Sequence, residues 1–434
     1  MNSFDIVGRM TKDKHELAEK LKNKGLIFQH TSEELEEITK NTSTLYLGVD
    51  PTADSLHVGN LLAFMTVRLF HEYGYKIVIL VGGGTATIGD PSGKTEERVL
   101  MDEETIDKNT DKLRKQISVA LASDDFELVN NKDWLGKIST LDFLRDVGKH
   151  FTVNDMLRKE SVKRRIEDPD SSISFTEFAY MLLQAYDFYV LHEKFGCDLQ
   201  LGGSDQWGNI TAGVELIRKK SQKTAHGITS PLLLDKTTGR KFGKTEAGTI
   251  WLDSKKTSPF QYYQFWYNTD DESAGEYIKY YTLLEEKEIE KIVEKTKDKP
   301  EERLVQTTLA FEATKFIHGE ESAVLVQNIS KALFNNDLSK LSKGEKDMLL
   351  EAVPHHAIKK EDMEKGKSYV DILLESELAS SKRDARTLLE SNAVMIDGVK
   401  IEEPEGVLEK GSVKGGISIL RKGKRDILLV TIED

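Results

Sequence analysis

The segment GVDPTADSLHVGNLL places two hydrogen-bond donors, His57 and Asn60, at the expected start of a helix. The first N–H groups of a helix have no partner within it, and the helix dipole favours negative charge at that end. We expect Asp54 or Ser55 to cap this helix. The segment is therefore suited to holding a phosphate chain, although a histidine at the start of a helix is also a common structural cap.

Two glycine-rich segments, GGGTATIGDPSGKTEER and KFGKT, look at first like phosphate-binding loops. The P-loop pattern needs four residues between its first glycine and the GK[ST] triplet, but only three separate Gly89 from Gly93, or Gly239 from Gly243. The dinucleotide pattern GxGxxG also fails, because its third glycine would fall at Thr87. We therefore expect neither a P-loop nor a dinucleotide-binding loop.

A third candidate site lies in FTEFAYMLLQAYDFYVL, which has helical character throughout. Tyr180, Gln184 and Asp187 are spaced so that they project from one face of this largely apolar helix. Polar groups in such a place need partners, and two interpretations stay open: a buried polar network, or a small polar pocket for an aromatic ligand. LGGSDQWGN, farther along, fits either an ordinary tight turn or a close approach to a ligand.

The elements that would position these residues follow a βαβ pattern. Residues 44–49 and 76–81 have the apolar runs of buried strands, and residues 57–72 have the spacing of an amphipathic helix. A strand near 197–202 and a helix at about 208–220 continue the alternation. This order predicts an α/β fold with a parallel sheet, whose ligands bind at the carboxyl ends of the strands.

The second half of the chain has a different character. Residues 257–350 are rich in Lys, Glu and Leu with helical periodicity, which predicts an all-α domain. Residues 354–366 lose this periodicity and are interpreted as a linker. Beyond the linker we predict an amphipathic helix, a second helix with a capping box at Ser381 and Asp384, and a hairpin at VMIDGVKI with an Asp-Gly turn.

Composition limits what these motifs can mean. With 434 residues the chain has room for about two to four domains, and it contains no apolar run of the roughly 18 residues that a membrane span requires. The amino terminus has no apolar signal core, and Cys197 stands alone, which excludes disulfide frameworks and thiolate metal clusters. We therefore expect a cytoplasmic protein with no membrane partner.

The formal net charge of −13 denies the chain a general basic surface for nucleic acid, and we expect no DNA partner. Any contact with RNA must be local. Two basic clusters are candidates, Arg158 to Arg165 and Arg421 to Arg425, although such runs are also ordinary solvated faces.

The order of DPTADSLHVGN, IGDPSGK, SFTEFAYMLLQAYDF, GGSDQWGN and KFGKT resembles the catalytic core of bacterial-type tyrosyl-tRNA synthetases, which are class I aminoacyl-tRNA synthetases. The resemblance covers essentially the whole chain. LHVGN corresponds to the family's H-x-G-H signature, with Asn60 in place of the second histidine, and KFGKT corresponds to its K-M-S-K-S mobile loop. An amide at position 60 can donate a hydrogen bond but cannot carry a positive charge.

The resemblance implies a tyrosine–tRNA ligase. Such an enzyme activates L-tyrosine with ATP as tyrosyl-adenylate, releases pyrophosphate, and transfers the tyrosyl group to the terminal ribose of tRNA(Tyr). Mg²⁺ would accompany ATP, bound mainly through phosphates and water, so we expect no dedicated metal site and no tightly bound cofactor. The resemblance also implies a homodimer.

Roles for individual residues follow from the resemblance. The groups that would stabilise charge during activation are His57, Asn60, Lys94, Arg98, Lys241, Lys244 and Thr245. The groups that would bind tyrosine are Tyr46, Asp90, Tyr180, Gln184, Asp187 and Gln200. The groups that would line the ATP site are Gly48, Asp50, Thr52, His57, Asn60, Asp205, Lys241 and Lys244.

Within the tyrosine site, Tyr46 and Asp187 would hold the phenolic hydroxyl. A site built to bond a hydroxyl rejects phenylalanine, because its own buried polar groups would then be left unpaired. Within the ATP site, Asp205 would be placed for the ribose.

The implied architecture has five parts. They are a Rossmann-like catalytic domain at 1–234, the signature mobile loop and connection at 235–256, an α-helical anticodon-arm-binding domain at 257–350, a linker at 351–366, and a small α+β RNA-binding domain at 367–434.

Two alternatives remain. A tryptophanyl-tRNA synthetase shares the fold and the signature loops, but the pairing of Tyr46 with Asp187 and the carboxyl-terminal domain favour tyrosine. A non-catalytic RNA-binding paralogue would be marked by loss of the loop lysines, and Lys241 and Lys244 are both present.

Overall fold

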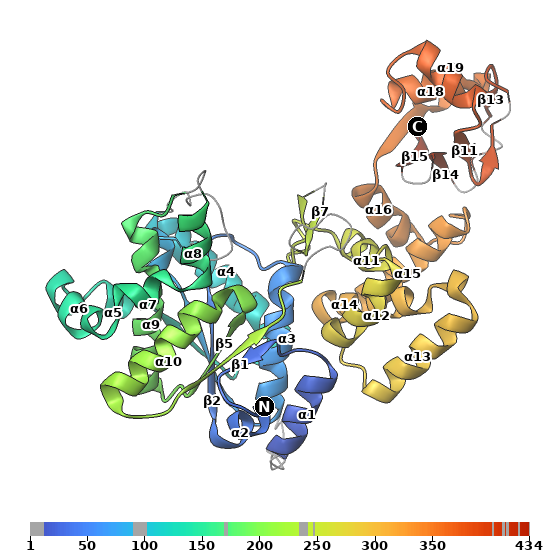
Figure 1. The fold of residues 1–434 in the computed structure, drawn as a ribbon. Helices are drawn as coiled ribbons and strands as arrows, with labels where there is room; N and C mark the ends of the chain where they lie inside the picture. Colours follow the sequence, from blue (N-terminus) through green and yellow to red (C-terminus); the bar gives the residue numbers. More distant parts are fainter. Residues whose placement is uncertain are drawn as a thin grey trace, which may run out of the picture. The chain divides into compact units, whose positions relative to one another are not determined.

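The computed structural model describes most of the chain as two compact units (Figure 1). The first unit comprises Met1–Lys256 and Asp270–Leu309, and the second comprises Thr257–Thr269 and Ala310–Asp434. The residues described are 13–89, 102–168, 172–233, 242–245, 248–401, 403–409, 413, 416–423 and 426–433.

The first unit is built on a six-stranded sheet with the order β1-β6-β5-β2-β3-β4. Every neighbouring pair is parallel except β1 with β6. The strands are β1 (Gln29–His30), β2 (Thr44–Val49), β3 (Lys76–Val81), β4 (Glu127–Asn130), β5 (Leu199–Gly203) and β6 (His226–Ser230). The predicted parallel sheet is therefore confirmed, and the strands predicted at 44–49 and 76–81 have the bounds observed for β2 and β3.

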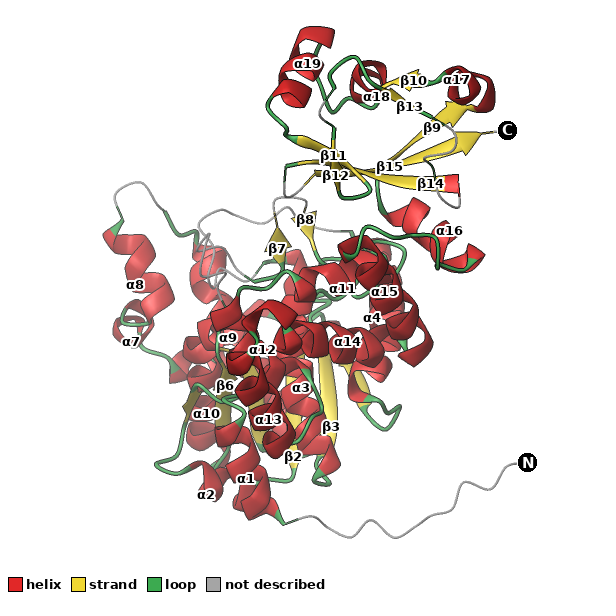
Figure 2. Ribbon diagram, turned by 90° about the vertical axis from the view of Figure 1, so that its right-hand side faces the viewer, coloured by secondary structure: helices red, strands yellow, loops and turns green. Residues whose placement is uncertain are grey.

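Helices cover both faces of this sheet (Figures 1 and 2). On one face, α3 (Val58–Glu72) packs against β2, β3, β5 and β6. On the other, α9 (Phe175–Phe195) and α10 (Trp207–Ser221) pack on side chains such as Tyr46, Val78 and Leu80. The remaining helices of the amino-terminal part are α1 (Lys14–Asn23), α2 (Leu35–Asn41), α4 (Glu103–Leu121), α5 (Lys132–Leu135), α6 (Thr140–Asp146), α7 (Val153–Leu157) and α8 (Glu160–Glu167).

Helix α9 has clear local reasons for its bounds. Its amino end is a capping box, in which the Ser174 hydroxyl accepts from the Glu177 N–H and the Glu177 carboxylate accepts from the Ser174 N–H. Its carboxyl end is Gly196, at a φ of 71° that glycine adopts without steric cost. Glu177 also pairs with Arg165 at 2.9 Å, which ties α8 to the start of α9. The predicted helix is confirmed.

The helical region predicted at 257–350 is helical, but its helices divide between the two units. Helices α12 (Asp271–Tyr281) and α13 (Glu286–Asp298) belong to the first unit, whereas α11 (Pro259–Tyr267), α15 (Glu320–Phe334) and α16 (Lys343–Ala352) belong to the second. Helix α14 (Leu304–His318) contains the boundary between the units. No helix in the described ranges is long and apolar enough to cross a membrane.

The carboxyl-terminal part of the second unit is a five-stranded sheet with the order β12-β11-β14-β15-β9, with α18 and α19 above it in Figure 2. The predicted hairpin is confirmed, because Asp397 and Gly398 have φ angles of 45° and 81°, as a two-residue primed turn requires. Ser381 caps α19 by accepting from the Asp384 N–H. The elements are β9 (His355–Lys359), α17 (Lys360–Lys365), β10 (Lys367–Ser368), α18 (Tyr369–Glu375), α19 (Lys382–Glu390), β11 (Val394–Ile396), β12 (Val399–Lys400), β13 (Val407–Leu408), β14 (Ile417–Lys422) and β15 (Asp426–Glu433).

The interpretation of 354–366 as a linker is wrong. His355–Lys359 is the edge strand β9, which pairs in parallel with β15, and the helix α17 follows it directly. Ile358 is buried in the core of this domain. The sequence HHAIK has a single strongly apolar residue, and its partner strand lies far along the chain, so local periodicity could not reveal it.

Candidate active site

A cavity of about 610 Å³ opens at the carboxyl ends of the parallel strands of the first unit. Its wall includes the residues that follow these strands: Asp50 after β2, Gly82 after β3, Asn131 after β4 and Pro231 after β6. The strand order reverses between β2 and β5, and ligands of open α/β sheets bind in the crevice at such a reversal. The cavity is therefore where this topology predicts a ligand.

The predicted site residues converge on this cavity. All of those whose side chains are described contribute to its wall: Tyr46, Gly48, Asp50, Thr52, His57, Asn60, Tyr180, Gln184, Asp187, Gln200 and Asp205. Asp90, Lys94, Arg98 and Lys241 lie outside the described residues. For Lys244 and Thr245 the backbone is described, as the short strand β7 (Lys244–Thr245) paired with β8 (Gly248–Thr249).

Two buried polar atoms on neighbouring strands have no hydrogen-bond partner among the described residues. Tyr46 of β2 and Gln200 of β5 are register partners, so their side chains emerge side by side on one face of the sheet. Within the described part of the chain, neither the Tyr46 hydroxyl nor the Gln200 Oε1 atom has a hydrogen-bond partner, although both are buried. Buried polar groups without partners are rare in folded proteins. A polar ligand at this position would satisfy both.

Asp187 of α9 lies at the same end of the cavity and is 2% exposed. Its two oxygens accept hydrogen bonds from the Asn131 amide at 2.9 Å and from the Trp134 indole N–H at 2.7 Å. Burial raises the pKa of this carboxyl to about 7, while the two donors act in the opposite direction. Each oxygen has a further lone pair, so the carboxylate can accept from a ligand hydroxyl while both donors stay in place.

The phenol of Tyr46 remains protonated beside this carboxylate. Burial, and then the charge of Asp187, raise the pKa of Tyr46 well above its ordinary value. The Tyr46 ring is held by Phe188, with the ring centroids 5.0 Å apart. Tyr46 therefore presents a hydroxyl that can donate or accept, and Asp187 presents an acceptor.

The rest of the polar stripe on α9 is oriented by helix α10. The Asn209 amide donates to Gln184 Oε1 at 3.1 Å and to Gln206 Oε1 at 3.1 Å. Tyr180 lies one helical turn before Gln184 and is also buried against the cavity. Both open interpretations of this stripe therefore hold in part, because the polar groups form a network and the network lines a pocket.

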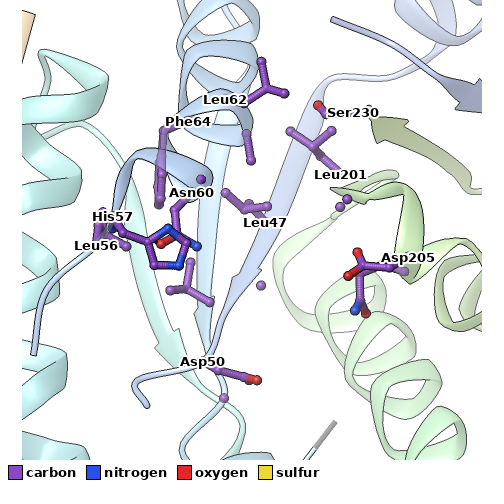
Figure 3. Close-up of a pocket in the computed structure, with 18 of the residues that line it drawn as sticks. Leu47, Asp50, Leu56, His57, Asn60, Leu62, Phe64, Leu201, Asp205 and Ser230 are labelled. Carbon is purple, nitrogen blue, oxygen red and sulfur yellow. The ribbon is translucent and has the colours of Figure 1, made fainter. Parts of the chain in front are cut away.

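The other side of the cavity is the amino end of α3, where His57 and Asn60 lie together and Asp205 lies across from them (Figure 3). The His57 backbone N–H donates to Asn60 Oδ1 at 3.1 Å, so Asn60 closes the first turn of the helix. With its oxygen engaged, the Asn60 amide has its NH₂ group to offer to a ligand. The helix dipole adds to this preference for an anion.

The prediction that Asp54 or Ser55 caps this helix is wrong, because His57 is the N-cap residue. Asp54 forms ion pairs with Lys112, at 2.8 Å, and with Lys256. The Ser55 hydroxyl donates to the carbonyl of Leu56 at 2.8 Å. These contacts hold the chain between Asp54 and His57, which precedes α3, in place.

The two signature segments are in direct contact. The Val58 N–H donates to the Ile250 carbonyl at 3.1 Å, and the Leu252 N–H donates to the Leu56 carbonyl at 2.8 Å. A Cβ atom at Gly59 would lie 3.2 Å from the carbonyl oxygen of Phe242 and 2.9 Å from the His57 ring. Glycine at position 59 thus lets Phe242 of the KFGKT segment approach the amino end of α3.

Three residues that the sequence did not single out complete the site. Asn131 and Trp134 hold Asp187, and Asn209 orients Gln184. The one available signal was the Asn-Asn pair that ends ELVNN, since polar side chains after a short apolar run mark the carboxyl end of a strand. That β4 strand was not predicted.

Comparisons with known proteins show the family to which the chain belongs. The family described as tRNA synthetases class I (W and Y) matches residues 39–335, and the family described as Tyrosine–tRNA ligase SYY-like C-terminal domain matches residues 345–430. The Tyrosine–tRNA ligase of Roseiflexus castenholzii is 44% identical over 425 residues, 96% of this chain and 99% of the relative. That of Geobacillus kaustophilus is 45% identical over 426 residues, with the same coverage.

Among solved structures, a C-terminally truncated mitochondrial tyrosyl-tRNA synthetase of Aspergillus nidulans matches with a TM-score of 0.65 and 33% identity, covering 73% of this chain and 94% of that chain. The chain therefore belongs to the class I tRNA synthetase family that contains the tryptophan and tyrosine enzymes. Within that family, its carboxyl-terminal domain and its nearly full-length relatives are those of tyrosine–tRNA ligases, and it is an enzyme of this kind.

The environment of Asp187 predicts a pH dependence. Since the pKa of this carboxyl is raised to about 7, the charged acceptor is lost as the pH falls through 7. We expect the KM for tyrosine to rise by up to about tenfold per pH unit below that value. Trp134→Phe removes a donor that favours the charged form, so the midpoint should move to higher pH. Steady-state kinetics between pH 5.5 and 8.5 measure both, and Asp187→Asn is the control without a titrating group. A midpoint that persists in Asp187→Asn would rule out this assignment.

Proposed function

We propose that this cavity catalyses both steps of tyrosine–tRNA ligation, with the residue roles that follow. In the first step, a carboxylate oxygen of L-tyrosine forms a bond to the α-phosphorus of ATP, the bond from that phosphorus to the bridging oxygen breaks, and pyrophosphate leaves. In the second step, a terminal ribose hydroxyl of tRNA(Tyr) attacks the carbonyl carbon of the adenylate, and AMP leaves. No side chain needs to form a covalent bond.

The observation that carries this proposal is a pair of buried polar atoms, the Tyr46 hydroxyl and Gln200 Oε1, that have no partner in the part of the chain that is described, together with the held carboxylate of Asp187. We assign the phenolic hydroxyl of tyrosine to Tyr46 and Asp187, and its ammonium end to Tyr180, Gln184 and Gln200. Tryptophan has an indole N–H where tyrosine has a hydroxyl, and phenylalanine has neither, so both leave these groups imperfectly paired.

The phosphates of ATP would lie at the amino end of α3. We assign His57 and the Asn60 amide to this chain, together with the lysines of the KFGKT segment, because positioned donors stabilise the charge that develops as pyrophosphate leaves. The cavity wall beyond them offers Gly48, Asp50 and Thr52, and Asp205 is assigned to the ribose. Mg²⁺ would enter with ATP, held mainly by phosphate oxygens and water, and we place the reaction in the cytoplasm.

Amino-acid-dependent exchange of pyrophosphate into ATP tests this function. We expect tyrosine to support exchange, and tryptophan and phenylalanine to support it at least about a hundredfold less well at equal concentration. Tyr46→Phe, which removes the hydroxyl and keeps the ring, should raise the KM for tyrosine. Exchange that prefers tryptophan, or no exchange with any amino acid, would contradict the proposal.

The helices that follow the sheet and the carboxyl-terminal domain are proposed to bind tRNA. We assign the helices within 257–350 to the anticodon arm, and the carboxyl-terminal domain, counted from β9 onward, to RNA. What supports this is the match of residues 345–430 to the carboxyl-terminal domain family and the basic side chains on α19, Lys382, Arg383 and Arg386.

Removal of residues 354–434 separates the two activities. The cavity lies in the first unit, so we expect pyrophosphate exchange to stay within about twofold of the full chain. Charging of tRNA should fall by at least about tenfold at low salt, and charging by the truncated chain should depend less on salt concentration than charging by the full chain, since phosphate contacts are lost. Full charging efficiency in the truncated chain would show that this domain does not bind the tRNA.

A homodimer is the proposed assembly. Six of the fourteen large apolar side chains that are exposed in the described residues lie between Leu141 and Phe175, on α6 to α8 and the start of α9. Phe175 is 79% exposed and Leu141 is 78% exposed. A concentration of exposed apolar side chains on one segment is typical of a surface that another protein covers, and in this family that partner would be a second copy.

Sedimentation velocity tests the dimer. We expect the full chain to sediment at the mass of two copies and Phe175→Glu to shift it toward a single copy, because burial of a charge in an apolar contact is costly. Phe28→Glu is the matched control, as Phe28 is also exposed, at 62%, but lies outside this segment. Equal behaviour of the two variants would exclude the Leu141 to Phe175 surface as the dimer contact.

A further inference from the structure

Helix α12 carries two tyrosines that hold the strand of the KFGKT segment. Phe242, within that segment, is 8% exposed. Its ring centroid lies 4.6 Å from that of Tyr277 and 5.8 Å from that of Tyr281, and both tyrosines are on α12. The Tyr277 and Tyr281 rings also contact each other edge-on, with centroids 6.1 Å apart. We refer to Tyr277 and Tyr281 as the aromatic cradle of Phe242.

Backbone hydrogen bonds and close packing also fix the chain at Phe242 and Gly243. The Phe242 N–H donates to the Leu233 carbonyl at 3.0 Å, and the Ile250 N–H donates to the Gly243 carbonyl at 2.9 Å. Gly243 has a φ of 85°, and a Cβ atom there would lie 2.5 Å from Val58 Cγ2. Phe242 and Gly243 are therefore held between the cradle and the first turn of α3.

The cradle and the donors of α3 belong to one packed body. Helix α12 packs directly on α3, which begins next to His57 and contains Asn60. Lys24 closes the carboxyl end of α12, since its ammonium group donates to the carbonyls of Lys279, Thr282 and Leu284 at 3.2–3.4 Å. Because α1, which ends next to Lys24, also packs on α3, Lys24 gives α12 a second, indirect link to α3.

We propose that the aromatic cradle is a positioning element for adenylate formation: Tyr277 and Tyr281 hold Phe242, and Phe242 fixes the backbone of β7, which begins at Lys244, against the amino end of α3. The inference rests on the proposed function. The cradle comes from α12, a helix that the sequence assigned to the tRNA-binding region. Part of that region therefore determines how the phosphate-binding donors are arranged.

Within the cradle, Tyr277 acts through Phe242 and not by contact with the substrate. Phe242 and Tyr281 are part of the cavity wall, whereas Tyr277 is not among the described residues that line it. A loss of activity on truncating Tyr277 would therefore be transmitted through the Phe242 ring. Misplacement of a charge-stabilising group by about 1 Å is enough to slow a reaction on the order of a hundredfold, and it affects the transition state more than the bound ground state.

Single-turnover formation of tyrosyl-adenylate is the kinetic test. We expect Tyr277→Ala and Phe242→Ala each to lower the rate constant at least about tenfold, with the dissociation constant of tyrosine within about twofold of the unchanged enzyme. The two losses should not multiply in the double variant, because each removes the same contact. Tyr277→Phe and Phe242→Met keep a ring or a flexible apolar side chain in place, and both should restore most of the rate.

Tyr267→Ala is the matched control. Tyr267 stacks on Tyr263 in α11, with ring centroids 6.1 Å apart, and both lie in the second unit. Its truncation removes a comparable aromatic contact and should leave the rate of adenylate formation unchanged. A loss equal to that of Tyr277→Ala would mean that the cradle has no specific role.

Amide hydrogen exchange of the resting enzyme gives a readout that does not depend on activity. Tyr277→Ala should speed exchange at Phe242 and Ile250, whose N–H groups hold the segment in place, and leave the amides of β2 and β3 protected. Unchanged protection at Phe242 and Ile250, or losses that multiply in the double variant, would overturn the proposal. Absence of tyrosine-dependent activity in the unchanged enzyme would instead refute the proposed function, since the exchange measurement tests the cradle separately.

Discussion

The site depends on how a buried carboxylate is held. Asp187 lies beneath the sheet with almost no exposure, and a charge in that position must either be neutralised by a proton or be stabilised by donors. Asn131 and Trp134 provide the donors, one to each oxygen. Asn131 also accepts from the Gly84 N–H at 2.7 Å and donates to the Thr85 hydroxyl at 3.0 Å. The carboxylate, the end of β4 and the loop after β3 are therefore one hydrogen-bonded unit.

The topology of the sheet explains why this unit faces a cavity. Strands β2 and β5 are neighbours, but the chain builds β3 and β4 on one side of β2 before it returns to form β5 and β6 on the other. The connections leave the carboxyl ends of β2 and β5 in opposite directions, so a space opens between them. Tyr46 and Gln200 come from these two strands at the same register. The reversal of strand order therefore places Tyr46, Gln200 and the amino end of α3 around the same cavity.

The elements that the sequence predicted correctly are those with a strong local pattern. Strands β2 and β3 are apolar runs, and α9 has a capping box at one end and a glycine at the other. The site residues inferred from the family's motifs line one cavity wherever their side chains are described. Their individual roles stay predictions. What local pattern could not supply was tertiary pairing. Asn131 and Trp134 lie far from Asp187 in sequence, and β9 pairs with a strand near the end of the chain.

The N-cap of α3 at His57 is a second case in which local sequence pattern did not reveal the contacts that form. Capping preferences favour Asp54 and Ser55. Asp54 instead forms ion pairs with Lys112 and with Lys256, which lies beyond the KFGKT segment. His57 is the N-cap residue instead, and the Asn60 side chain accepts from its backbone N–H. The ion pairs of Asp54 are long-range contacts, which no short window of sequence contains.

The division of the chain into units also bears on how the protein is made. The first unit includes residues 270–309, which are synthesised after residues 257–269 of the second unit. A ribosome releases the chain from its amino end, so the six-stranded sheet can form while α12 is still inside the exit tunnel. Phe242 can pack against Tyr277 and Tyr281 only after α12 has been synthesised. Maturation of the enzyme is therefore a late event in translation, separate in time from the folding of its sheet.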